Sequence, residues 1–303
     1  MHRRDLLKRS TAFGLLSAIP GWGPEDRSAS SGVAESPPLK PPPQGSIPVA
    51  FVVSDGAVII DFCGPWEVFQ DVGVPGRDGD AFHLYTVAET TTPIRASGGM
   101  RIVPDYAFEA APPPKVVVIA AQSGSDAAVK WIRASARGAD VVMSMCTGAF
   151  VLAKTGILSG KRATTHHASY RGLAMAYPDI RVQPGARFVD EGHVATAGGL
   201  SSGIDLALHV VERYFGRDVA KSTAYQMEYQ GQGWMDPGSN SAYAVVRAST
   251  DAHPVCPVCD MDVDPKLAPK SVHLGKAYYF CSASHKGQFD AAPDSFIKAI
   301  ARP

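Results

Sequence analysis

The feature that most constrains the fold is a repeated alternation that begins at Ile47 and continues to about residue 245. Short β-branched runs such as SIPVAFVV (46–53) alternate there with amphipathic segments such as SDAAVKWIRASARG (125–138). The runs at 115–121 and 140–145 are apolar almost throughout, which is typical of strands buried on both faces of a parallel sheet. The sequence therefore predicts an α/β domain over residues 47–245, with helices covering the sheet.

Two later segments extend this prediction. RFVDEGHVATAGG (187–199) is typical of a hairpin or paired strands. SSGIDLALHVVERYFG (201–216) predicts a helix with Ser201 or Ser202 as its N-cap and Gly216 at its end.

The first residues carry paired arginines, Arg3 and Arg4, before a short apolar run. This arrangement resembles a twin-arginine export signal, and the small residues that end at Ala34 suit its cleavage. The run is too short to span a bilayer, so we expect an exported, periplasmic protein with no stable membrane span in its mature form. The alternative is a disordered basic tail on a cytoplasmic protein. We assign residues 1–34 to the signal and the proline-dense residues 35–46 to a stiff linker.

Charge composition limits the partners of this chain. It has 29 basic and 29 acidic residues, so its formal net charge is zero and it lacks the basic excess that binds phosphate backbones. We therefore expect no nucleic-acid partner, whereas a small-molecule substrate is what the family resemblance described below implies.

A single cysteine stands where the second apolar run ends. Cys146 is followed by Thr147 and Gly148, which let the chain turn sharply into the helical segment TGAFVLAK, and Gly156 closes that segment. Such an elbow presents a side chain at the carboxyl edge of the sheet, where α/β folds bind ligands. Free amides at the helix start favour an anion, so this thiol is expected to ionise more easily than in free solution. The alternative is an inert cysteine that packs in the core.

Several separated segments together resemble one family. They are DFCGPWEVF (61–69), CTGAFVLAKTGILSGKRATTHH (146–167), GGLSSGIDLALHVVERYFG (198–216) and QMEYQGQGWMDPGSN (226–240). In order and spacing they resemble the DJ-1/PfpI superfamily, and within it the branch that contains isonitrile hydratases. The resemblance covers roughly residues 47–245. It implies a flavodoxin-like, class I glutamine amidotransferase-like sandwich with a mostly parallel sheet.

The resemblance also implies roles for three residues. It makes Cys146 the reactive residue, Asp61 an acid that faces it from the first helix, and Thr147 a helper beside the thiol. Asp61 lies in an apolar stretch, 58–68, where burial would favour its protonated form. The alternatives are that Asp61 caps its helix and that Thr147 is an ordinary residue of a helix start. No cofactor is expected at this site.

Two further features bear on this site: His166 and the turn after the third main strand. His166 is either a catalytic base or a pocket or packing residue, and Cys63 is expected to pack. Members of the family carry a proline-glycine-glycine turn whose backbone donates to the reacting group, whereas this chain has Ala120, Ala121 and Gln122. The donor geometry is therefore expected to differ, with the Gln122 side chain as a substitute donor.

The hydratase resemblance implies addition of water to R-N≡C, which gives an N-substituted formamide. The alternative is a non-catalytic extracytoplasmic protein that senses or binds small ligands or metals. Glyoxalase-like and peptidase-like activities share the same elbow. Related regulators add a DNA-binding helix-turn-helix after the core, whereas this chain adds a cysteine-rich segment. The family's members are commonly dimers, so a homodimer is expected.

The cysteine-rich segment predicts a metal site. Cys256 and Cys259 are two residues apart, and Cys281 is followed by His285 with three between. Three thiolates and an imidazole suit Zn, and thiolates also suit Cu. Residues 253–299 resemble a YHS domain, from which this chain departs by its added Cys256 and by His285 at a usual cysteine position. The alternative is a metal-free mini-domain with a Cys256–Cys259 disulfide.

Overall fold

A computed structural model describes residues 36–244, 249–250, 253–259 and 261–300. The export signal predicted over residues 1–34 lies outside these ranges. Among the helices in the described ranges, none combines the length and the apolar character that crossing a membrane requires.

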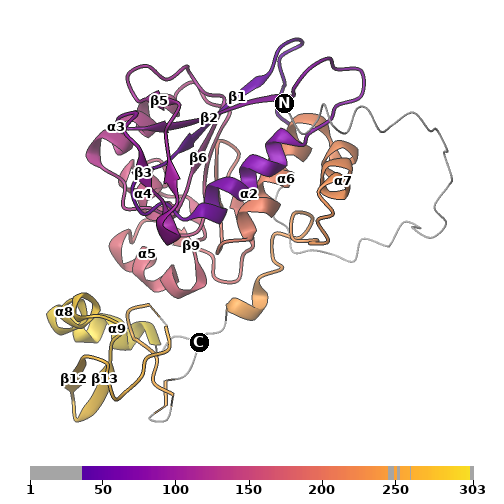
Figure 1. The fold of residues 1–303 in the computed structure, drawn as a ribbon. Coiled ribbons are helices and arrows are strands. Elements are labelled where there is room, and N and C mark those ends of the chain that lie inside the picture. The colour runs from indigo at the N-terminus through magenta and orange to yellow at the C-terminus, as the bar shows by residue number, and fades with distance from the viewer. Residues whose placement is uncertain (1–35, 245–248, 251–252, 260, 301–303) are drawn as a thin grey trace, which may run out of the picture. The chain divides into compact units, whose positions relative to one another are not determined.

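Within the described residues, seven strands form one sheet in the order β10-β11-β7-β6-β1-β2-β5 (Figure 1). Neighbouring strands are parallel except for β10, which pairs antiparallel with β11 at one edge. This arrangement confirms the predicted α/β fold with a mostly parallel sheet. The strands are β1 (Ile47–Val52), β2 (Phe82–Ala88), β5 (Tyr106–Ala107), β6 (Val116–Ile119), β7 (Val141–Ser144), β10 (Phe188–Asp190) and β11 (Val194–Ala197).

Helices cover both faces of this sheet because successive strand residues point to opposite sides. On β1, Val49 and Phe51 enter one core cluster, while Ala50 and Val52 enter the other. The first cluster includes side chains of α2 (Ile59–Gln70), α6 (Ser202–Phe215) and α7 (Arg217–Gln226). The second includes side chains of α3 (Asp126–Ser135), α4 (Gly148–Lys154) and α5 (Tyr170–Ala176). The domain is therefore a three-layer sandwich, with helices on either side of the sheet in Figure 1.

Short elements join these layers. They are the strand pairs β3 (Ile94–Arg95) with β4 (Arg101–Ile102) and β8 (Arg162–Ala163) with β9 (Arg181–Val182), and the 3-10 turns η1 (Ser97–Gly99), η2 (His167–Ser169) and η3 (Ser241–Tyr243).

The local sequence signals coincide with these elements. The predicted hairpin is the β10–β11 pair, with Phe188 opposite Ala197. Helix α6 has Ser201 at its N-cap position, although no side-chain bond caps it, and it ends at Gly216 with φ of 85°. That left-handed conformation carries little cost for glycine, which explains why the helix stops there.

The proline-rich residues 36–46 contain no helix or strand, yet they lie against the domain. The Leu39 N–H donates to the Arg213 carbonyl over 2.7 Å, and the Arg213 guanidinium donates to the Pro37 carbonyl. Arg77 donates to the Pro42 carbonyl over 3.0 Å. These contacts were not apparent from the composition of the segment.

The cysteine-rich residues 253–300, called the C-terminal unit below, have a hydrophobic cluster separate from the two clusters that flank the sheet. A hairpin of β12 (Lys270–His273) and β13 (Lys276–Tyr279) precedes α8 (Ala283–Ala291) and α9 (Pro293–Ile300). Its core contains Cys256, Val258, Phe280, Phe289 and Phe296. A core of this size is small for an independent unit, which usually requires a metal or a crosslink.

The sheet order determines where a site can form. From β1 the chain proceeds to β2 on one side, whereas β6 lies on the other side of β1. The topology thus switches direction between β1 and β6, and ligands of such sheets bind beyond the carboxyl ends of the strands at this point. Strand β7 lies next to β6, with Ser144 opposite Ile119, so the residues after Ser144 emerge at this edge.

Candidate functional site

Cys146 occupies a strained turn between β7 and α4. Its φ is 52°, a left-handed conformation that a non-glycine residue adopts at a cost. Its N–H donates to the Gly198 carbonyl over 3.0 Å, and its carbonyl accepts the Thr165 hydroxyl over 2.9 Å. The surrounding structure therefore holds the turn in place from both peptide groups.

Gly148 allows the helix after this turn to begin directly against β6. A Cβ at this position would lie 2.5 Å from the Ile119 carbonyl oxygen and 2.8 Å from that of Ala120. Backbone atoms cannot move aside as a flexible side chain can. The glycine of the Cys-Thr-Gly sequence thus serves close packing of helix and strand.

The Cys146 side chain is buried, with 6% of the residue exposed. Burial, and after it the negative charge of Asp61, raise the pKa of its thiol to about 11. Hydrogen bonds from the Leu200 N–H and from the Thr147 N–H and hydroxyl lower the pKa but do not offset these effects. The prediction that this thiol ionises more easily than in free solution is wrong, because desolvation outweighs the amides at the helix start.

Asp61 is fully buried in the first turn of α2. Its Oδ2 accepts the Ala121 N–H over 3.0 Å, while its Oδ1 has no hydrogen-bond partner among the described residues. Burial raises the pKa of this carboxyl to about 6, against the lowering effect of the Ala121 bond. The N-cap position of α2 is Val58, so the alternative in which Asp61 caps the helix is wrong.

Thr147 is the N-cap residue of α4, but its side chain does not cap the helix. Its hydroxyl bonds to the Cys146 sulfur instead. The residue therefore lies where the family resemblance places a helper.

His166 lies beside this site without joining it. Its Nδ1 accepts the Ala168 N–H over 3.2 Å, so the neutral ring carries its proton on Nε2 and that nitrogen is a donor. Burial lowers the pKa of His166, as does the neighbouring His167. Across the residues with described positions, no hydrogen bond joins the His166 ring to Cys146. This geometry favours the pocket or packing role over that of a base.

In the altered turn after β6, the Ala121 N–H and the Gln122 side-chain amide both donate hydrogen bonds to other groups of the protein. The Ala121 N–H binds Asp61, and the Gln122 side-chain amide donates to the Val52 carbonyl over 2.8 Å. Gln122 is thus committed to the backbone of β1 and does not replace the missing glycine amides near the sulfur. It also borders a cavity of about 310 Å³ at the ends of β1, β2 and β6, which neither Cys146 nor Asp61 lines.

The structure adds Leu200, which the sequence interpretation missed. Its φ of 44° is left-handed, and its N–H bonds to the Cys146 sulfur. The preceding residue, Gly199, packs closely against His166, because a Cβ on Gly199 would lie 2.6 Å from Cδ2 of that ring. The glycine pair after β11 was the available signal, because it marks a backbone that approaches its neighbours closely.

The second cluster of chemical interest lies in the small C-terminal unit. Cys256 and Cys259 lie in the turn around the bridge between Val255 and Asp262, and Cys281 follows β13. His285 lies in the first turn of α8, where its N–H donates to the Ser282 side chain over 3.2 Å.

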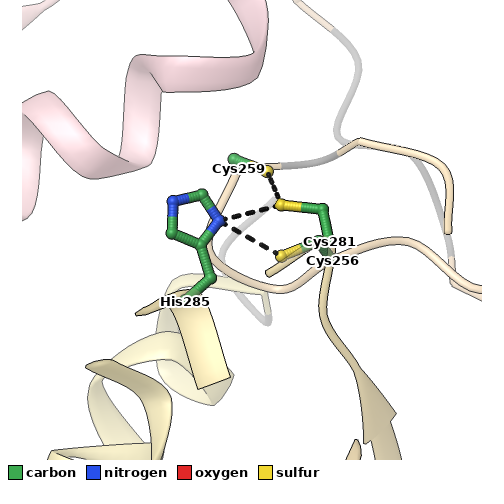
Figure 2. A group of neighbouring side chains, drawn as sticks. All are labelled: Cys256, Cys259, Cys281 and His285. Carbon is green, nitrogen blue, oxygen red and sulfur yellow. Dashed lines mark hydrogen bonds between the residues drawn. The ribbon is translucent and has the colours of Figure 1, made fainter. Parts of the chain in front are cut away.

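The side chains of these four residues point toward one another (Figure 2). Their donor atoms all lie within 4.8 Å of one another. The Cys281 sulfur is 3.1 Å from Nδ1 of His285 and 3.5 Å from the Cys259 sulfur. The Cys256 sulfur is 3.7 Å from the same Nδ1.

This donor set fits a tetrahedral metal ion. Zn²⁺ bonds sulfur at about 2.3 Å and nitrogen at about 2.0–2.1 Å, so ligand atoms around it stand roughly 3.5–3.8 Å apart. The Cys259–Cys281 and Cys256–His285 separations of 3.5 and 3.7 Å fall in that range, and the Cys281–His285 separation of 3.1 Å is shorter. The Cys259 thiol donates to the Cys256 sulfur, which lowers the pKa of Cys256 and raises that of Cys259. Both cysteines are free thiols in this structure.

A parallel α/β sandwich with a cysteine at a strand–helix elbow, near a buried carboxyl group, defines a class of cysteine-centred proteins. The DJ-1/PfpI family matches residues 48–213, which include Asp61, Cys146, Thr147 and His166. The chain belongs to this family.

Individual relatives agree with this assignment. An isonitrile hydratase of Pseudomonas putida is 30% identical over 200 residues, which cover 64% of this chain and 83% of the hydratase. A crystal structure of a THiJ/PfpI family protein from Pseudomonas syringae has a TM-score of 0.54 at 22% identity, covering 71% of this chain and 83% of that one. The transcriptional regulator GbdR of Pseudomonas aeruginosa is 23% identical over 197 residues, which are 62% of this chain but only 53% of the regulator.

The effect of the Asp61 charge on the pKa of the Cys146 thiol can be tested directly. In Asp61→Asn, loss of the carboxylate should lower the pKa of Cys146 from about 11, while burial keeps it above its ordinary value of 9.0. We expect the pKa to fall by about one unit, which raises the thiolate fraction about tenfold at a given pH. NMR titration of isotope-labelled cysteine Cβ, assigned with Cys146→Ser, measures it.

The matched control is Asp71→Asn, which changes the same residue type at the other end of α2. It should leave the pKa of Cys146 unchanged. An unaltered or higher pKa in Asp61→Asn would show that the sulfur does not sense this carboxylate.

Proposed function

We propose that the main domain is a cysteine-dependent hydratase of the isonitrile hydratase type, which converts R-N≡C to an N-substituted formamide. One observation carries the proposal: a buried thiol lies within the electrostatic influence of a buried carboxyl, one of whose oxygens has no hydrogen-bond partner in the part of the chain that the structure describes. The hydratase of Pseudomonas putida, which is 30% identical, supports the choice of substrate class.

The pKa directions specify the resting state for this reaction. Asp61 has a pKa of about 6 and Cys146 one of about 11, so at neutral pH most molecules hold a carboxylate and a neutral thiol. The roles follow from this. Asp61 accepts the thiol proton through its free Oδ1 as the sulfur attacks, so it acts first as a general base.

The first half of the reaction forms a carbon–sulfur bond. The Cys146 sulfur adds to the terminal carbon of the isonitrile, and Asp61 takes the S–H proton. Asp61 then returns that proton to the same carbon, which gives the thioimidate R-N=CH-S-Cys146. The carboxylate is regenerated, and no oxidant or reductant is needed.

The second half releases the product. Water adds to the thioimidate carbon as Asp61 accepts one of its protons and passes it to the imine nitrogen, which gives R-NH-CH(OH)-S-Cys146. The hydroxyl of this intermediate then loses its proton to the sulfur through Asp61, its C–O bond becomes C=O, and the carbon–sulfur bond breaks. The sulfur leaves as a thiol and the product is R-NH-CHO, so the sum is R-N≡C plus water. The Leu200 and Thr147 donors lower the pKa of this sulfur and thereby favour its departure.

Turnover of a small alkyl isonitrile by the purified protein tests this proposal. Cys146→Ala should abolish formamide production, and Asp61→Asn should lower kcat by about 10²- to 10⁴-fold, as for loss of a general acid–base group. For the native chain, kcat/KM should rise as Asp61 ionises near pH 6 and stay level toward the pKa of the thiol. Formamide is quantified by chromatography.

Cys63→Ser is the matched control, because Cys63 is a half-buried cysteine of the same domain. It should retain full turnover. Full turnover in Cys146→Ala would exclude the mechanism. A native protein that binds isonitriles without converting them would favour the non-catalytic alternative.

For the C-terminal residues 253–299 we propose a YHS-like domain that holds one Zn²⁺. The convergence of Cys256, Cys259, Cys281 and His285 supports this second function. When bound, the ion would link both ends of the unit, since its ligands come from the first turn, the end of β13 and α8. Cu is the competing metal, because thiolates bind it as well.

Metal analysis of the full chain, purified under reducing conditions, tests the zinc site. We expect one Zn²⁺ per chain, and Cys259→Ser should weaken its binding by about a hundredfold or more. Cys63→Ser should bind as the native chain does. Absence of stoichiometric metal in the reduced native protein would contradict the proposal.

We also propose that residues 1–34 direct export to the periplasm through the twin-arginine route. The paired Arg3 and Arg4 support this. In a bacterial host, the protein should appear in the periplasmic fraction with a new N-terminus near residue 35. The charge-conserving double change Arg3→Lys, Arg4→Lys should keep it in the cytoplasm, and unchanged export of that variant would contradict the proposal.

A further inference from the structure

The turn between β11 and α6, residues 198–202, lies directly against the elbow that carries Cys146. The Gly198 carbonyl accepts the Cys146 N–H over 3.0 Å. Gly199 packs on the His166 ring, and Leu200 is left-handed with φ of 44°. This turn therefore bonds to the Cys146 elbow in a strained conformation, which persists only where the surrounding structure holds it.

Arg187 holds the turn from the side away from Cys146. Its carbonyl accepts the Gly198 N–H over 2.9 Å, and its Nη2 donates to the Ser201 hydroxyl over 3.1 Å. Asn240 adds a further contact, since its side-chain amide lies 3.4 Å from the Ser202 hydroxyl. Both ends of the turn are thus tied to the same pair of residues.

Arg187 is itself fixed by buried groups. Its Nε donates to Oδ2 of Asp205 over 2.7 Å, and its Nη1 donates to Oδ1 of Asn240 over 3.2 Å. Asp205 is fully buried, and the Tyr229 hydroxyl also donates to its Oδ2, over 2.9 Å. A planar guanidinium reaches Asp205, Asn240 and Ser201 at once, which a lysine ammonium on a flexible stem does not do.

The hydrogen bonds of Arg187 do more than complete an ion pair with Asp205, because they also reach the 198–202 turn. A buried pair contributes little net stability, because desolvation offsets the attraction between the charges. The hydrogen bonds of Arg187 converge on the residues that flank Leu200, and the Leu200 N–H is a donor to the Cys146 sulfur. A small shift of the turn would remove that donor.

We infer that Arg187, fixed by Asp205 and Asn240, is a positioning residue that holds the 198–202 turn against the Cys146 elbow. The inference rests on the proposed function for its catalytic meaning, because the turn would stabilise the sulfur when it carries negative charge. Arg187 acts through the turn and does not contact the reacting atoms.

The test compares the full-length native protein with Arg187→Lys and Ser201→Ala. Loss of the Leu200 donor should lower the iodoacetamide alkylation rate of Cys146 about tenfold and displace its pH profile upward by about one unit. Peptide-resolved mass spectrometry reports Cys146 separately from the other cysteines. With an alkyl isonitrile, kcat should fall while KM changes little.

Arg213→Lys is the matched control. Arg213 lies on α6 and is buried in an ion pair with Asp190 at 3.2 Å, but among the described residues its side chain bonds to Asp190, Gly192 and Pro37 and not to the turn. It should lower thermal stability without moving the alkylation profile of Cys146.

A native alkylation profile in both Arg187→Lys and Ser201→Ala would overturn the inference and leave Arg187 a structural residue. If Arg187→Lys does not fold, Ser201→Ala decides alone, since it removes one exposed hydroxyl. A displaced profile in a protein that converts no isonitrile would support the positioning role and reject the proposed hydratase activity.

Discussion

The structure depends on the joint burial of a thiol and a carboxyl group at the carboxyl edge of the sheet. Cys146 and Asp61 are both nearly inaccessible, and burial raises the pKa of each. Asp61 goes from an ordinary 3.8 to about 6, which corresponds to about 3 kcal/mol of folding free energy. Protonation of Asp61 contributes this free energy to the stability of the folded state, in full below pH 3.8, and the contribution is lost as the pH rises through about 6. At neutral pH the folded protein therefore holds a carboxylate that its burial destabilises. A purely structural site would gain nothing from this cost, which is why the pair is the centre of the proposed chemistry.

The same burial determines how the site can react. A neutral thiol cannot attack until its proton leaves, and Asp61 offers a carboxylate oxygen that has no hydrogen-bond partner among the described residues. The donors around the sulfur then decide how well it carries charge. They come from the start of α4 and from the turn after β11, and Arg187 secures the second of these. The proposed nucleophile, acid–base group and positioning residue thus belong to separate elements that meet at one sheet edge.

The C-terminal unit presents different chemistry on the same chain. The donor atoms of its three thiols and its imidazole lie within 4.8 Å of one another, and its apolar core is small. In such a unit a bound metal ion would contribute to folding as well as occupy a site. The main domain has an extensive core on both sheet faces, and its proposed reaction uses only side chains and water.

The sequence by itself determined the class of fold and the identity of the chemical groups. Apolar runs that alternate with helical segments require a covered parallel sheet, and the Cys-Thr-Gly step after a strand requires an elbow. The close spacing of Cys256 with Cys259, and of Cys281 with His285, likewise made the C-terminal donor set apparent from the sequence. Only the tertiary structure decided the protonation of Cys146, because desolvation sums over residues distant in sequence, whereas the helix-start amides that suggested the opposite sign are local. It also decided that Asp61 bonds the Ala121 amide, 60 positions away, and that Arg187 secures the turn carrying Leu200. Hydrogen bonds of this kind depend on which elements become neighbours, and no local pattern in the chain records that.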